Sequence, residues 1–105
     1  MSRFCPLFSG SSGNSTFVGT STYGILVDIG CSYKCTCTAL LERNISPKDI
    51  RAVAVTHTHS DHTSGLKTFL KKHPVPLIAS RITIDALIVN GIITEEHPTF
   101  CADDD

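Results

Sequence analysis

The chain has 105 residues, a formal net charge of −1 at pH 7 and 41% hydrophobic residues, which fits one globular domain or part of one. The near-neutral charge gives no general indication of a nucleic-acid or membrane partner, although a local basic patch stays open. No run of about 18 apolar residues occurs, so we predict no membrane-spanning helix. The N-terminus lacks a long apolar stretch and the five cysteines are an odd number, which predicts a cytoplasmic protein without a disulfide framework.

The first part of the chain reads as three strands. We predict them at residues 4–8, 16–19 and 24–28, with a small polar segment, residues 9–15, between the first two. The apolar run Ile25, Leu26 and Val27 is continuous, which favours a central strand covered on both faces. This strand ends at Asp28.

The remainder alternates helices with strands. Ser32 and Ser80 are candidate N-caps, Gly91 follows the last helix, and Pro76 argues for an edge position of its strand. Such alternation implies an α/β arrangement with helical crossovers. We predict helices over 32–44, 63–72 and 81–90, a capped turn over 46–49, and strands over 51–55 and 75–79.

The most informative segment is the run at residues 56–62, Thr-His-Thr-His-Ser-Asp-His, directly after a buried strand. His57 and His59 are two positions apart, so both rings can reach one metal ion from the same side of an extended backbone. Asp61 and His62 follow and can serve a second ion beside it. Two ions about 3.5–4 Å apart would activate water toward an ester or phosphate. The alternative is a polar loop of surface histidines or helix caps.

Other candidate ligands are weaker. His73 and His97 each stand alone, which favours surface or packing roles. Cys31, Cys35 and Cys37 lack the paired spacing of a zinc site, so we interpret them as small, partly buried thiols, with a metal or redox role as the alternative.

The histidine run resembles the His-x-His-x-Asp-His signature of the metallo-β-lactamase-fold hydrolases. Three further segments are similar to that family in order and spacing: residues 26–30, 45–50 and 63–66. The Gly/Ser segment at 9–15 is similar to the first hairpin of the WalJ-like branch, bacterial proteins regarded as DNA exonucleases. That segment would be a flexible turn or a loop whose N–H groups meet a phosphate.

The resemblance implies that residues 1–105 form a partial domain, the N-terminal half of an αββα sandwich, with helices on one face of a mixed sheet. His57 and His59 would bind the first metal, and Asp61 and His62 the second. Asp61 would also act in catalysis by orienting the attacking water. Asp28 would support the ligands or simply cap its strand. The family uses two divalent ions, zinc or manganese, of which this chain alone would hold one or none tightly.

The implied function is metal-dependent hydrolysis, as a phosphodiesterase or exonuclease acting on DNA in the full-length parent. Two alternatives are a hydrolase of a thioester, lactone or β-lactam, and an inactive truncated chain with weak or no metal binding. DNA is the expected partner, and Lys67, Lys71 and Lys72 would attract its backbone or form an ordinary solvated helix face. A homodimer completing the sandwich is a further expectation.

Overall fold

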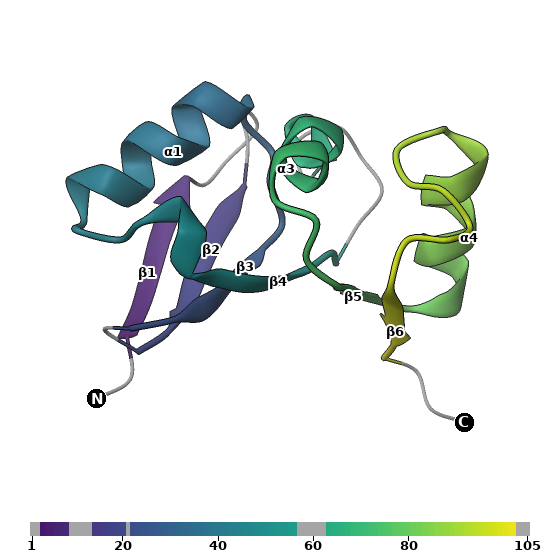
Figure 1. The fold of residues 1–105 in the computed structure, drawn as a ribbon, viewed down its shortest axis with the longest axis horizontal. Coiled ribbons are helices and arrows are strands. Elements are labelled where there is room, and N and C mark those ends of the chain that lie inside the picture. Colours follow the sequence, from purple (N-terminus) through teal and green to yellow (C-terminus); the bar gives the residue numbers. More distant parts are fainter. Residues whose placement is uncertain (1–2, 9–13, 21, 57–62, 103–105) are drawn as a thin grey trace.

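The computed structural model describes residues 3–8, 14–20, 22–56 and 63–102 (Figure 1). Six strands form one sheet in sequence order. The first three pair antiparallel and the remaining pairs are parallel. The strands are β1 (Arg3–Phe8), β2 (Ser15–Gly19), β3 (Gly24–Val27), β4 (Ile50–Ala54), β5 (Leu77–Ala79) and β6 (Thr99–Cys101).

Helices α1 (Tyr33–Glu42), α3 (Leu66–Lys72) and α4 (Arg81–Val89) connect the parallel strands, and a 3-10 turn, η1 (Pro47–Asp49), precedes β4. These helices of the described residues lie along the same face of the sheet (Figure 1). Sequential parallel strands joined by right-handed crossovers produce this arrangement. The predicted α/β fold, a mixed sheet with helices on one face, is confirmed.

The core lies between the sheet and these helices. One register row crosses the sheet through Phe17, Leu26, Val53 and Leu77. Each of these side chains is at most 1% exposed. They alternate with residues of the opposite face, as a pleated strand requires. This buried row fixes the positions at which β3 and β4 end relative to each other. It therefore also fixes where residues 56–62, which we call the histidine motif, begin.

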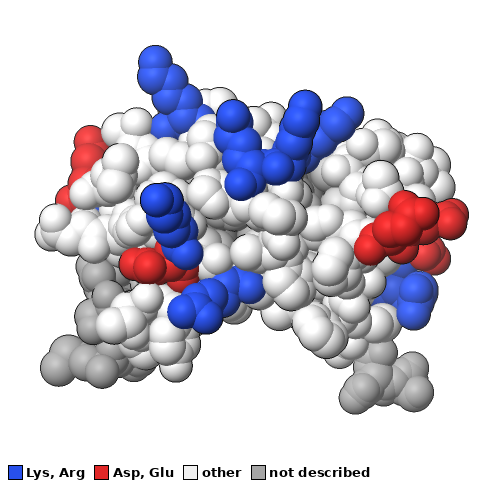
Figure 2. Space-filling model, in the orientation of Figure 1, with Lys and Arg blue, Asp and Glu red and all other residues white. Residues whose placement is uncertain are grey.

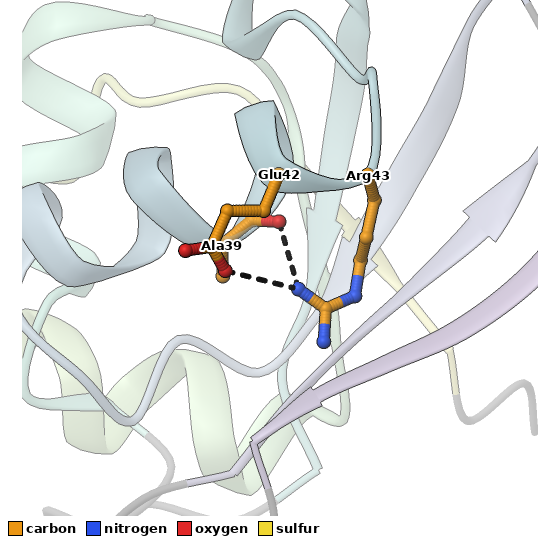
Figure 3. A network of polar contacts seen from close by, with 3 residues as sticks. All are labelled: Ala39, Glu42 and Arg43. Atoms are coloured by element: carbon orange, nitrogen blue, oxygen red, sulfur yellow. Dashed lines mark hydrogen bonds and ion pairs between the residues drawn. The ribbon is translucent and has the colours of Figure 1, made fainter.

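Local signals set the helix ends. Ser32 Oγ accepts the N–H of Cys35 (3.2 Å) at the start of α1, as predicted for an N-cap. At the other end of α1, Arg43 Nη1 donates to the carbonyl of Ala39 (2.9 Å) and lies 4.0 Å from a carboxylate oxygen of Glu42 (Figure 3). The Arg43 guanidinium is therefore engaged at the end of its own helix.

Three details of the predicted elements are wrong. The strand after Pro76 is internal, because β6 pairs beyond it, and Pro76 itself lies just before β5. Helix α3 begins at Leu66 rather than at residue 63, with Gly65 at its N-cap position. Strand β3 is central, yet only one of its faces is fully covered, since Ile25 and Val27 are half-buried.

The sheet face opposite the helices is apolar and open within the described residues. Phe4, Val18 and Phe100 are 71%, 37% and 61% exposed, and the register places them on this face together with Ile25 and Ile78. A second copy covering this face stays a prediction. Among the helices that the structure describes, none has the length and apolar content needed to cross a bilayer.

Candidate metal centre

The turn at residues 28–30, directly after β3, is hydrogen-bonded to Thr56, the residue before the four predicted ligands. Asp28 is buried, and its Oδ1 accepts the backbone N–H of Thr56 (2.7 Å) while its Oδ2 accepts the Thr56 hydroxyl (2.6 Å). The N–H of Asp28 donates to the carbonyl of Ala54 (2.7 Å). Asp28 adopts φ = +66°, a conformation that aspartate tolerates better than most residues. The carboxylate thus fixes the chain where it leaves β4 and enters the motif.

The same turn is also hydrogen-bonded to Ser64 and Gly65, which follow the motif. Ser64 Oγ donates to the carbonyl of Gly30 (2.5 Å), and the N–H of Gly65 donates to the carbonyl of Ile29 (3.0 Å). Gly65 permits this approach because a Cβ there would lie 1.9 Å from the carbonyl oxygen of Cys31. The chain entering the motif and the chain leaving it are therefore tied to one three-residue turn.

A third segment reaches this turn from the first hairpin. The N–H of Gly30 donates to the carbonyl of Asn14 (2.9 Å), the residue that follows the polar segment 9–13. The next residue, Ser15, is buried, and its hydroxyl has no hydrogen-bond partner within the described part of the chain. The end of the polar hairpin and both flanks of the motif therefore converge on residues 28–30.

The four predicted ligands, His57, His59, Asp61 and His62, lie outside the described residues, as do residues 9–13 of the Gly/Ser segment and the terminal residues 103–105. Their roles stay predictions. In the ranges that are described, no group of three or more His, Cys, Asp or Glu side chains could hold a metal ion. Three imidazoles and a carboxylate are donors that suit zinc and related divalent ions, and the two anchored flanks fix where this donor set begins and ends.

His73 and His97 have packing roles, as isolated histidines were predicted to have. His73 Nε2 is 2.8 Å from the hydroxyl oxygen of Tyr33, and its ring centroid is 4.8 Å from that of Phe69. His97 Nε2 lies 2.9 Å from the carbonyl oxygen of Val75. Both rings therefore tie separate elements together.

Cys5, Cys31, Cys35 and Cys37 are free thiols, and Cys35 and Cys101 are exposed. Burial raises the pKa of Cys31, and the neighbouring Cys35 raises it further. A hydrogen bond with Cys37 is the main cause that raises the pKa of Tyr33. Because the thiolate is the form that binds metals and reacts, a raised thiol pKa argues against such a role for Cys31.

Sequence reasoning named Asp28 as a support of the ligands or a strand cap, but it missed Thr56, Ser64 and Gly65 at the two flanks of the motif. Gly65 carries a usable signal, because glycine costs about 1 kcal/mol relative to alanine in a helix and so marks a close approach when it begins an apolar helix. Thr56 and Ser64 carry no such signal, since polar residues are ordinary in a loop. Their partners lie 28 and 34 positions away in the chain.

Comparison with known proteins identifies the family of this chain. Residues 9–99 match the model of the Metallo-beta-lactamase superfamily, and the chain belongs to this superfamily. It is 35% identical over 104 residues to exodeoxyribonuclease YycJ of Bacillus anthracis, covering 97% of this chain and 39% of that protein. It is 40% identical over 85 residues to exodeoxyribonuclease WalJ of Streptococcus pneumoniae serotype 2 (strain D39), covering 81% and 32%.

Among solved structures, the metallo-β-lactamase SMB-1 in complex with mercaptoacetic acid superposes with a TM-score of 0.73 at 14% identity, covering 98% of this chain and 44% of that one. This likeness concerns the fold. The chain spans about a third to two fifths of the length of the two curated relatives, YycJ and WalJ. The expected resemblance to the WalJ-like branch of the family is confirmed.

Proposed function

We propose that this chain carries part of the metal site of a metal-dependent phosphodiesterase that acts on DNA as an exonuclease. The observation that carries the proposal is that one buried turn, residues 28–30, holds both flanks of a four-ligand motif. Anchored ligands lose less conformational freedom when they bind an ion, and supporting groups of this kind orient a metal site. The exodeoxyribonuclease names of the relatives support DNA as the substrate.

In this proposal His57 and His59 would hold a first divalent ion, and Asp61 and His62 a second. Such ions, zinc or manganese, supply water activation and stabilise negative charge on a phosphate oxygen. Asp61 would also orient the attacking water. Asp28 supports the site indirectly, because its carboxylate holds Thr56 at the start of the motif. The same proposal includes a cytoplasmic location.

The chain is also shorter than its relatives, which bears on how completely it forms the site. It spans 39% of YycJ and 32% of WalJ. Within residues 63–102 the histidines are His73 and His97, both engaged in packing contacts. We therefore expect this chain alone to bind one ion or none tightly, and full activity to require the remaining length of a relative-sized protein.

The test measures bound metal per chain and release of nucleotides from end-labelled DNA, on this chain and on any longer product that contains it. His59→Ala should lose metal and hydrolysis, whereas the matched variant His97→Ala should retain both. Metal and activity that survive His59→Ala would overturn the proposal. Hydrolysis of a β-lactam, lactone or thioester without nuclease activity would instead support the other class of hydrolase, and absence of both metal and activity would indicate an inactive fragment.

A further inference from the structure

The five lysines of the chain are all exposed and gather over neighbouring elements. Figure 2 shows Lys and Arg side chains along the upper side of the view, above α1 and α3, whereas Asp and Glu lie mainly to the two sides. Two basic side chains outside this group have local partners: Arg43 at the end of α1 and Arg51, which lies 5.4 Å from the ring centroid of Tyr23. The lysines come from three elements: Lys34 from α1, Lys48 from η1, and Lys67, Lys71 and Lys72 from α3.

We call Lys34, Lys48 and Lys72 the lysine cluster: Lys72 lies beside one aromatic pair, Lys34 is adjacent to it in the chain, and Lys48 acts on it electrostatically. The pair is Tyr33, the first residue of α1, and His73, directly after α3. They are hydrogen-bonded at 2.8 Å, and Lys72 Nζ lies 5.6 Å from the centroid of the Tyr33 ring. Lys34 follows Tyr33 in the first turn of α1. The start of α1 and the end of α3 therefore meet at this pair.

Positive charge acts on this pair from two elements, although η1 also carries the acidic Asp49. Burial lowers the pKa of His73, and the ammonium groups of Lys72 and Lys48 lower it further. Two cations on different elements thus act on the same imidazole. The first turn of α1 contains no acidic residue, so the partial positive charge of that helix end adds to theirs.

A purely structural role accounts for only some of these lysines. Cations in the last turn of a helix complement its dipole, and Lys71 and Lys72 occupy the last turn of α3. Lys34 is at the opposite, unfavourable end of its helix, and Lys48 lies on a three-residue turn. Their convergence with Lys72 indicates a surface that attracts anions.

We propose that the lysine cluster binds the phosphodiester backbone of a DNA strand, as a contact surface separate from the histidine motif. The inference rests on the proposed function, which supplies DNA as the polyanion. Ammonium groups on flexible stems contact phosphates without reading sequence, as a nuclease of broad specificity requires. Because α3 has seven residues, the cluster lies about 10 Å along the helix from its start. At about 3.4 Å per nucleotide, roughly three nucleotides of a strand span that length.

The experiment measures binding of a fluorescent single-stranded oligodeoxynucleotide of about 20 nucleotides, longer than the ~4–16 nucleotides of a typical single-strand site. Binding is followed with EDTA present, so that hydrolysis does not intervene, and at several salt concentrations. For single strands the slope of log affinity against log salt is about −0.7 per phosphate neutralised. Changing Lys34, Lys48 and Lys72 together to Gln should make the slope shallower by about 2.

Two matched controls accompany this variant. Changing the same three lysines to Arg keeps the charges and should keep both affinity and slope. Arg81→Gln removes one exposed cation at the start of α4 and should weaken binding less than Lys72→Gln does. Melting curves of all variants check that the fold is retained. An unchanged slope in the triple Gln variant, or failure of the unaltered chain to bind the oligonucleotide at low salt, would overturn the proposal.

A second readout is local to the cluster. In an NMR titration, DNA should raise the pKa of His73, because a phosphate near Lys48 and Lys72 offsets their effect on the imidazole. Equal competition by polyaspartate of the same charge would show a general polyanion surface and contradict the assignment to DNA. Loss of hydrolysis in His59→Ala with unchanged binding separates this inference from the proposed function.

Discussion

The two ends of helix α3 are joined to the region of helix α1 in different ways. At the start, Ser64 and Gly65 bond to backbone carbonyls of residues 29 and 30, and Gly65 lies against the carbonyl of Cys31. At the end, His73 meets Tyr33 through side chains, with a 2.8 Å hydrogen bond between the rings. The start is fixed by backbone contacts that leave no space for a methyl group, and the end by side chains that can adjust.

This difference follows the expected chemistry of the two ends. The start of α3 comes directly after the histidine motif, where small displacements of ligands matter most. The end carries the lysine cluster, where flexible ammonium groups can follow a mobile polyanion. We therefore expect substitutions at the start to be costly and specific, and those at the end to be mild.

The largest expected effect is at Gly65. Gly65→Ala places a Cβ 1.9 Å from the Cys31 carbonyl oxygen, so backbone must shift. Overpacking of this kind costs about 3 kcal/mol, at the upper end of its usual range. Urea denaturation should show the free energy of unfolding reduced by about that amount.

Gly91 provides the matched control for this substitution. It has φ = +75° and open space around its Cα, so Gly91→Ala meets only the backbone penalty of about 1 kcal/mol. Equal losses for the two alanine variants would show that α3 can move away from residues 29–31, and the proposed rigidity of this end would be wrong.

The next largest effect is expected at Asp28. Asn is close in shape and tolerates a positive φ, but Asp28→Asn loses charged hydrogen bonds to the N–H and hydroxyl of Thr56. We expect a loss of about 2 kcal/mol in the free energy of unfolding, together with weaker metal retention. Thr56→Val removes only the hydroxyl bond and should cost about 1 kcal/mol. A larger loss in Thr56→Val than in Asp28→Asn would contradict the anchoring role of the carboxylate.

Sequence patterns predicted the elements well because their signals are local. Ser32 and Ser80 cap the helices they were predicted to cap, and the apolar runs at residues 25–27 and 51–55 correspond to β3 and β4. The last strand, β6, was missed because Thr-Phe-Cys is too short to show a period. Its pairing with β5 is also what makes the edge prediction for the Pro76 strand wrong.

The candidate site also has one part that the sequence shows and one part that only the fold determines. The ligand types and their spacing are visible in the sequence, because all four lie within six positions. The anchoring of Thr56 by Asp28 depends on strands β3 and β4 ending side by side, which is a property of the sheet register. No local pattern states that register, so the hydrogen bonds between Asp28 and Thr56 could be found only from the structure.

At the other end of α3, Tyr33→Phe should have a smaller effect. The substitution keeps the ring, which lies 6.0 Å from Phe69 and 5.7 Å from His73 between centroids, and removes the hydroxyl that contacts His73 Nε2. One hydrogen bond contributes about 1 kcal/mol. Thermal unfolding should show this loss, and the part due to the His73 contact should disappear when Tyr33→Phe is combined with His73→Phe, whereas the part due to the hydrogen bond with Cys37 should remain. A loss as large as that in Gly65→Ala would remove the difference between the two ends.

The pH dependence of stability gives a finer test of the same end. Burial, Lys72 and Lys48 lower the pKa of His73 in the folded chain, so the unfolded chain binds that proton more tightly. The free energy of unfolding should therefore fall as the pH decreases below about 6.5, the ordinary histidine value, until it passes the folded pKa. His73→Gln should flatten this decline. A decline that is identical in the variant would assign it to other groups.

The smallest effect is expected from the three cysteines at and just before the start of α1. Burial and the neighbouring Cys35 raise the pKa of Cys31, which disfavours the thiolate that binds metals. Changing Cys31, Cys35 and Cys37 together to Ser should leave the metal content of the chain unchanged, as measured by elemental analysis beside His59→Ala. Loss of metal in the triple serine variant, with retention in His59→Ala, would move the metal centre from the histidine motif to the first turn of α1.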